Sequence, residues 1–114
     1  MKIKLIRSFS AAHRLPKYQG PCHDLHGHTW KVVFTIEGPV KADGMVCDFK
    51  IIKRLLDENL PDHQFLNDWV ENPTAENLAQ YLFDKIGPVL AAQQLTLRTL
   101  ELWESDNAAA ILER

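Results

Sequence analysis

Three of the chain's five histidines fall within six residues, in the segment Cys22-His23-Asp24-Leu25-His26-Gly27-His28. His26 and His28 are two positions apart, and side chains at i and i+2 of a β-strand point to the same face. Imidazole nitrogens are common ligands of Zn²⁺, so two histidines with this spacing can share one metal ion. His23 has the opposite parity, and we expect it to face solvent or to support the site from outside.

His13 is the candidate third ligand, because it lies in phase with the apolar side chains of the segment that precedes it. If the segments around His13 and His26 pair as strands, three imidazoles converge. Three neutral nitrogen ligands leave a fourth position for water or substrate, which is typical of catalytic rather than structural zinc. A rival ligand set combines Cys22 with the local histidines. It ranks lower, because Cys22 lies in a loop and is better placed beside the metal as a reactive group.

The elements that must position these histidines are two alternating segments. Residues 2–12 carry apolar side chains mostly at odd positions, which is the two-residue period of a half-buried strand. Residues 14–25 contain two prolines and a glycine and are expected to form a loop. A second strand is predicted from about Leu25 to Glu37, with His26 and His28 on its more apolar face.

Two helices are predicted in the middle of the chain. Asp48 suits the N-cap of a helix from Phe49 to about Asn59, and Thr74 suits the N-cap of a second helix. The apolar residues of the second helix recur on one face. The Gly87-Pro88 pair is expected to weaken its end.

Residues 95–104 and 108–113 are predicted to form a hairpin around the turn Ser105-Asp106-Asn107. The apolar phase shifts between Leu97 and Leu100, which indicates a bulge or burial on both faces. The order ββααββ predicts an α+β fold, an antiparallel four-stranded sheet with two helices on one face, built as a single domain over residues 1–114. The uncovered face retains apolar residues, so we expect it to pack against other subunits.

Composition excludes several classes of protein. The chain has 114 residues, 46% of them hydrophobic and 25% charged, with a formal net charge of −2. It has no basic block that would favour nucleic acid, no apolar run long enough to cross a membrane and no secretory signal. Two cysteines make no disulfide framework, so a reducing, cytoplasmic setting is expected.

Several short motifs together resemble the 6-pyruvoyl-tetrahydropterin synthase family. They occur in the family's order and span nearly the whole chain: Phe9-Ser10-Ala11-Ala12-His13, Cys22-x-x-x-His26-Gly27-His28, Asp48-Phe49, Asp62-His63-x-x-Leu66-Asn67, Asn72-Pro73-Thr74-Ala75-Glu76 and Glu104. The resemblance is closest to the bacterial branch, the 6-carboxytetrahydropterin synthases of queuosine biosynthesis. It implies the tunnelling fold (T-fold) and a homohexamer of two stacked trimers, with sites at subunit interfaces. Pro61 and Ser105 depart from the leucine and threonine usual in the family.

The resemblance also implies a reaction. Zinc held by His13, His26 and His28 would bind 7,8-dihydroneopterin triphosphate, and the products would be 6-carboxy-5,6,7,8-tetrahydropterin, acetaldehyde and triphosphate. By the same resemblance, Cys22 would be the general base. Asp62 and His63 would activate it as a relay.

The substrate contacts implied by the resemblance involve three further residues. Glu104 would anchor the pterin, because a carboxylate accepts two parallel hydrogen bonds from an amino-pyrimidine edge. Thr74 and Glu76 would contact the pterin as well, although Thr74 is equally explained as a helix cap. The sequence does not choose which cations bind triphosphate; the available ones are Arg14, Lys17 and Lys31.

Three alternatives stay open from the sequence. A 6-pyruvoyl-tetrahydropterin synthase would eliminate triphosphate without losing carbon from the side chain. A zinc- or pterin-binding module would keep the metal and the pocket without turnover. A purely structural zinc would unfold the chain on its removal.

Overall fold

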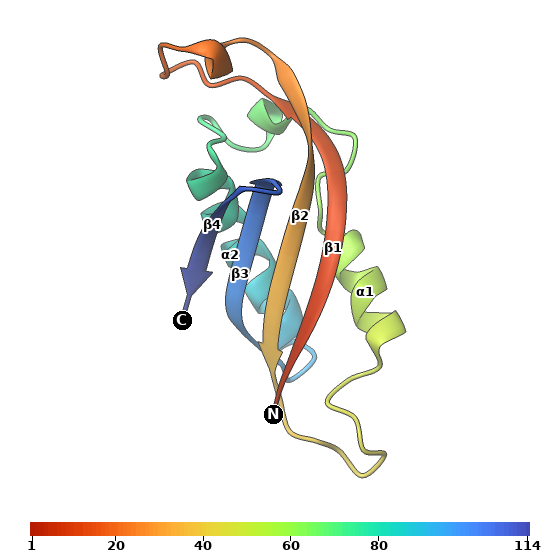
Figure 1. Cartoon of the computed structure of the whole chain (residues 1–114). Coiled ribbons are helices and arrows are strands. Elements are labelled where there is room, and N and C mark those ends of the chain that lie inside the picture. The colour runs from red at the N-terminus through yellow and green to blue at the C-terminus, as the bar shows by residue number, and fades with distance from the viewer.

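The computed structural model describes residues 1–114, apart from the side chain of Cys22. Its elements follow the order ββααββ (Figure 1). The strands and helices are β1 (Lys2–His13), β2 (His26–Glu37), α1 (Phe49–Asp57), α2 (Ala75–Ala91), β3 (Thr96–Ser105) and β4 (Ala108–Glu113), with short 3-10 turns at Pro21–His23 (η1) and Leu66–Asp68 (η2). The predicted element order and α+β class are therefore confirmed.

The four strands form one antiparallel sheet in the order β1-β2-β3-β4. β1 and β2 pair along their whole length, from Lys2 opposite Glu37 to His13 opposite His26. Because directly opposed residues in an antiparallel pair point to the same face, this register fixes which side chains share a surface. Alternate positions of β1 are buried as the sequence pattern predicted, and His13 continues that buried set with an exposure of 0%.

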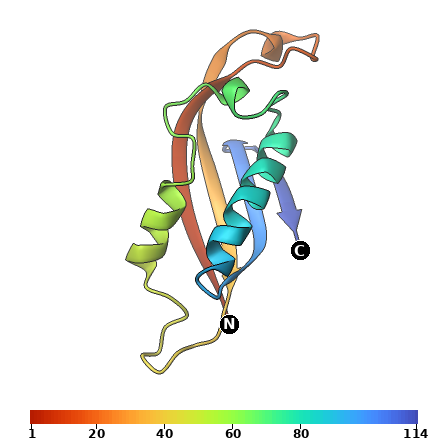
Figure 2. The same ribbon diagram turned by 180° about the vertical axis from the view of Figure 1, so that it is seen from behind.

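Both helices cover the same face of the sheet (Figure 2). α1 lies over β1 and buries Ile52 and Leu56, while α2 lies over β3 and β4. Each helix begins at its predicted N-cap: Asp48 accepts a hydrogen bond from the Lys50 amide, and Thr74 accepts one from the Asn77 amide. The end of β1 and the start of β2, where His13 lies opposite His26, are toward one extremity of the elongated molecule (Figure 1).

α2 continues through Gly87-Pro88, where the sequence predicted a weakened end, and ends at Ala91. Proline lacks the amide hydrogen for the bond one turn earlier, yet the last turn is held because Leu90 is fully buried. The amide of Ala92 also donates to the Pro88 carbonyl at 3.1 Å. Tertiary packing therefore outweighs the local signal here.

The predicted irregularity in the strand after α2 is confirmed. Thr35 pairs with Thr99 and Ile36 with Leu97, so Arg98 is an extra residue in β3. Its guanidinium donates a hydrogen bond of 2.9 Å to Glu37 Oε1. The hairpin turn is shorter than predicted, because Ser105 still belongs to β3.

The helix-free face of the sheet mixes polar side chains with apolar ones, among them Val33 and Trp103 on the two inner strands. Ile6 and Ile111 occupy the two ends of one lateral row across the four strands, and both are more than half exposed. Trp103 is covered by Lys31, whose Nζ lies 4.8 Å from the indole centre. Within the described residues, neither helix reaches the length and apolar character that a membrane crossing requires.

Candidate metal centre and adjoining pocket

The end of β1 and the start of β2 bring three imidazoles together. His13 pairs with His26, and His28 pairs with Ala11, so the three rings share the face that the helices cover. One nitrogen from each of His13, His26 and His28 lies within 4.8 Å of the other two. This is the one such group of His, Cys, Asp or Glu side chains among the described residues.

Backbone carbonyls fix which nitrogen of two rings carries the proton. His13 Nδ1 lies 2.8 Å from the Pro73 carbonyl oxygen, and His26 Nδ1 lies 2.7 Å from that of Asp24. A carbonyl oxygen only accepts, so each Nδ1 must donate and each neutral ring keeps its lone pair on Nε2. Those two Nε2 atoms face each other at 3.0 Å. Two lone pairs at that distance repel unless a proton or a metal cation lies between them.

Burial favours a metal over a proton at this position. Desolvation lowers the pKa of His13, outweighing the bond to the Pro73 carbonyl, which acts in the opposite direction. Desolvation also lowers the pKa of His28. The neutral ring, which is the metal-binding form, is therefore favoured. His28 Nε2 is buried and has no hydrogen-bond partner among the described residues, so the donor set fits a cation with three imidazole ligands.

Trp30 lies beneath the cluster and restricts its rings. It is fully buried, and its ring centre lies 5.2 Å from those of both His13 and His28 in edge-to-face geometry. The indole Nε1 donates to the Ala11 carbonyl at 3.3 Å. A rigid apolar floor of this kind holds ligand side chains in place and excludes water from one side of the site.

Glu104 reaches the same site from β3. Its Oε1 lies 3.4 Å from His28 Nε2, close enough for an ion pair but without hydrogen-bond geometry. The carboxylate raises the pKa of His28, although burial outweighs it. The structure thus places Glu104 beside the histidine cluster, which the sequence pattern alone could not do.

Asp62 and His63 follow α1 and attach to the end of β1. Asp62 Oδ1 accepts the Ser10 amide hydrogen at 2.9 Å, and the His63 amide donates to the Ser10 carbonyl at 2.6 Å. The bond from Ser10 is the main reason that the pKa of Asp62 is lowered, with His63 adding to it. His63 adopts a left-handed φ of 57°, its side chain is 82% exposed, and its Nδ1 lies 3.0 Å from Asp62 Oδ2. The His63 imidazole is therefore held by the Asp62 carboxylate and points into solvent.

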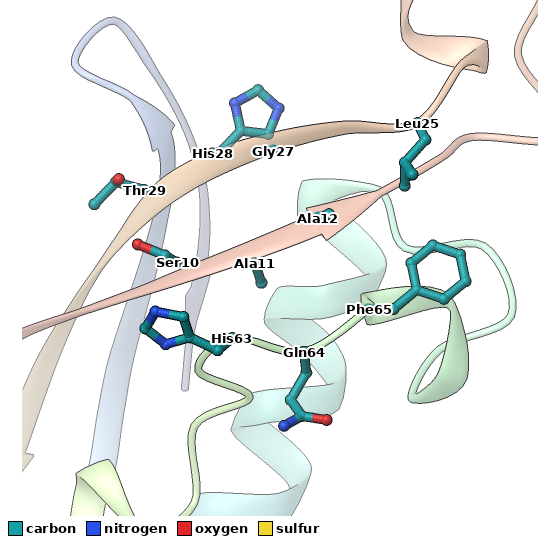
Figure 3. A pocket seen from close by; sticks show the side chains of 10 residues that line it. All are labelled: Ser10, Ala11, Ala12, Leu25, Gly27, His28, Thr29, His63, Gln64 and Phe65. Atoms are coloured by element: carbon teal, nitrogen blue, oxygen red, sulfur yellow. The ribbon is translucent and has the colours of Figure 1, made fainter.

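A pocket of about 710 Å³ is lined by His28 of the histidine cluster and by His63 of the Asp62–His63 pair. His28 comes from β2 and His63 from the segment after α1, with the end of β1 between them (Figure 3). The other lining residues are Ser10, Ala11, Ala12, Leu25, Gly27, Thr29, Gln64 and Phe65. Among the described residues that line this pocket there is no lysine or arginine, so Arg14, Lys17 and Lys31 are not part of its wall. The Cys22 side chain lies outside the described residues, and its position beside the metal stays a prediction.

Two predicted substrate contacts lie apart from the pocket. Thr74 Oγ1 accepts the Asn77 amide hydrogen at 3.1 Å, as a helix cap does. Glu76 lines a smaller cavity between α2 and β4. Their contact with a pterin stays a prediction.

His23 is exposed, in agreement with its parity, and Cys47 is buried, where desolvation raises the pKa of its thiol.

Sequence reasoning missed the groups that orient the ligands. The carbonyls of Pro73 and Asp24 are backbone atoms, and no side-chain pattern reveals them. The Asn67 side chain binds both the amide and the carbonyl of Arg14 at 2.9 Å, which ties η2 to the residue after His13. Asn67 stands in the motif Asp62-His63-x-x-Leu66-Asn67, which marked it as a residue of interest but did not indicate this role.

Comparison with known proteins points to one family. The family described as 6-pyruvoyl tetrahydropterin synthase matches residues 2–114. A 6-carboxy-5,6,7,8-tetrahydropterin synthase of Synechocystis is 40% identical, covering 69% of each chain. A dihydroneopterin monophosphate aldolase of Pyrococcus furiosus is 35% identical, covering 99% of each. The structure of Caenorhabditis elegans 6-pyruvoyl tetrahydropterin synthase superposes with a TM-score of 0.85 at 28% identity, covering 100% of this chain and 95% of the other.

Proposed function

The chain belongs to the 6-pyruvoyl tetrahydropterin synthase family, and we propose that it is a zinc-dependent carbon–carbon lyase. Its substrate is 7,8-dihydroneopterin triphosphate, which with water yields 6-carboxy-5,6,7,8-tetrahydropterin, acetaldehyde and triphosphate. This reaction places it in queuosine (7-deazaguanine) biosynthesis, in the cytoplasm. The similarity to a 6-carboxytetrahydropterin synthase supports this choice within the family.

The observation that carries the metal assignment is the pair of facing Nε2 atoms of His13 and His26, 3.0 Å apart. Their Nδ1 protons are committed to carbonyls, and the nearby His28 Nε2 has no partner among the described residues. We assign these three residues as zinc ligands. Bound zinc supplies Lewis acidity, which stabilises negative charge developing on a substrate oxygen.

The proton-transfer roles fall to Cys22 and the Asp62–His63 pair. Cys22 removes a proton from the substrate side chain, and a thiol near cationic groups has the lowered pKa that this requires. Asp62 holds the His63 ring through its Nδ1, so that Nε2 is free to accept and return a proton. Because His63 and the metal ligand His28 line one pocket, a substrate there could meet both.

Glu104 orients the pterin ring. Its partly exposed carboxylate lies next to His28, where it can accept two hydrogen bonds from the amino-pyrimidine edge. Such binding would fix the pterin ring, so that its side chain could reach a zinc ion held by the three histidines. We propose that Thr74 and Glu76 also contact the pterin, in a site that lies at a subunit interface. The exposed Ile6 and Ile111 support assembly of copies, which we propose as a homohexamer of two trimers.

A second candidate is aldol cleavage of dihydroneopterin monophosphate. The 35% identity to an aldolase of that name over nearly the whole of both chains favours it. The pocket wall without lysine or arginine also suits a substrate with fewer phosphate charges. Aldol cleavage releases a glycolaldehyde phosphate, whereas the lyase reaction releases acetaldehyde.

Product analysis decides among these reactions. The zinc-loaded protein is incubated separately with the triphosphate and the monophosphate of dihydroneopterin, and aldehydes and pterins are identified by mass spectrometry. Acetaldehyde with 6-carboxytetrahydropterin is the expected result. Glycolaldehyde phosphate would indicate the aldolase, and triphosphate release without any aldehyde would indicate pyruvoyl-tetrahydropterin synthesis. Zinc binding without turnover of either compound would leave only the binding module.

A further inference from the structure

Asn77 lies in the first turn of α2 and is bonded to the turn that holds His13. We propose that Asn77 is a positioning residue for the metal centre, acting through the Pro73 carbonyl and the ring of His13. The inference rests on the proposed function in one respect, namely that the same three histidines bind the metal. It concerns metal affinity and not the reaction that follows.

The connection consists of four hydrogen bonds. Asn77 Nδ2 donates to the Asn72 carbonyl at 2.8 Å, and the Thr74 amide donates to the same oxygen at 2.8 Å. The Asn77 amide donates to Thr74 Oγ1 at 3.1 Å. Asn72 and Thr74, the residues on either side of Pro73, are therefore both fixed by Asn77. The Pro73 carbonyl is left to accept the Nδ1 proton of His13 at 2.8 Å.

The geometry makes His13 sensitive to this turn. The His13 side chain is fully buried, and the Pro73 carbonyl is 60 residues away along the chain. Proline contributes a fixed φ and no amide hydrogen, so the turn depends on its neighbours for its position. A partner that donates or accepts at the outer nitrogen of a ligating histidine fixes its tautomer and increases its basicity. Loss of such partners weakens metal binding by about 10- to 100-fold.

Asn77 also belongs to the helix cap, and a substitution must separate the two roles. Position 77 is the third residue of α2 after its N-cap, where an acidic side chain is favourable because of the helix dipole. Asn77→Asp therefore preserves the helix start. Its carboxylate cannot donate to the Asn72 carbonyl, so the one side-chain bond from position 77 to the Pro73 turn is lost, while the backbone bonds of the turn remain. Helix stability and metal affinity should respond differently to this one change.

The test measures zinc affinity of the full chain without any substrate. Metal is removed with a chelator, and Zn²⁺ binding is followed by competition with a chromophoric chelator for the wild type, Asn77→Asp, Asn77→Ala and Asn59→Ala. Asn59 is the matched control, because its Nδ2 donates to the Leu55 carbonyl at the same 2.8 Å in α1. Thermal unfolding of each metal-free variant is recorded in parallel.

We expect the two Asn77 variants to bind Zn²⁺ about 10-fold or more weakly than the wild type, and Asn59→Ala to bind as the wild type does. Asn77→Asp should retain the thermal stability of the metal-free protein. Wild-type zinc affinity in Asn77→Asp would overturn the inference, and so would an equal loss in Asn59→Ala. If Asn77→Ala does not fold, Asn77→Asp decides alone. Tight zinc binding without turnover in the wild type would refute the proposed reaction and leave this inference standing.

Discussion

Zinc added to the metal-free protein should raise its melting temperature, and the rise should depend on His28. We choose His28→Ala because His28 Nε2 has no hydrogen-bond partner among the described residues and the side chain is 22% exposed. Its removal therefore costs the metal-free fold little, whereas His13 is buried and bonded to Pro73. The substitution removes one of three ligands and leaves the apolar core intact.

The size of the effect follows from linkage. Zinc at about 1,000 times its Kd stabilises the folded wild type by about 4.1 kcal/mol. For a chain of 114 residues, an unfolding entropy of about 2.1 cal/mol/K per residue gives about 0.24 kcal/mol/K, so Tm rises by about 17 °C. If His28→Ala weakens binding about 100-fold, the same zinc is about 10 times Kd and the rise falls to about 6 °C.

The assay is circular dichroism melting of both proteins with and without zinc. The metal-free wild type should be folded at 25 °C, because its buried apolar core extends along the sheet away from the histidines. An equal zinc-induced shift in both proteins would refute the ligand assignment of His28. A metal-free wild type that is unfolded at 25 °C would refute a catalytic site on a preformed fold and would indicate structural zinc instead.

Three further predictions concern residues around the site. Asp62→Asn should lower the free energy of unfolding at pH 7, and the difference from wild type should shrink below about pH 4. The hydrogen bond from the Ser10 amide lowers the pKa of Asp62 in the folded state. The Asp62 carboxylate therefore stabilises the fold above its unfolded-state pKa, and this stabilisation is lost as the pH falls through the folded-state pKa. Urea titrations at pH 7 and pH 3 measure the difference in unfolding free energy between the variant and the wild type. Glu104→Gln should lower kcat/KM by about 100-fold, the loss expected for two charge-assisted hydrogen bonds, while zinc content by atomic absorption stays at wild-type level. Leu66→Ala should lower the free energy of unfolding, measured by urea denaturation, by about 2–5 kcal/mol, because Leu66 is fully buried in the segment that carries His63. A loss below about 1 kcal/mol would show that Leu66 does not anchor this segment.

The strands and the histidine cluster were predictable because both depend on parity. The two-residue period of a strand assigns each side chain to a face, and the buried set of β1 ends on His13 as the pattern indicated. Arg7 departs from that pattern, since it has the parity of the core. It lies at the sheet edge, where its guanidinium bonds Asp57 of α1 at 2.6 and 2.8 Å. A sequence pattern does not reveal which strand is at an edge.

The groups that orient the ligands were not predictable for a different reason. The Pro73 carbonyl meets His13 only because α2 begins at that point of the folded chain. Carbonyls are identical at every position, so contacts between distant segments cannot be inferred from residue type. The end of α2 could not be located from the sequence for a similar reason, because burial of Leu90 offsets the local cost of Pro88.

If this chain cleaves the side chain of a dihydroneopterin phosphate at a zinc centre held by three histidines, aldehyde release must depend on those histidines. The most direct measurement is aldehyde release from dihydroneopterin triphosphate by the zinc-loaded wild type, with His26→Ala as the metal-site control. We expect acetaldehyde in equal amount to 6-carboxytetrahydropterin from the wild type, and none above background from the variant. Consumption of substrate without acetaldehyde, or equal release by His26→Ala, would contradict it.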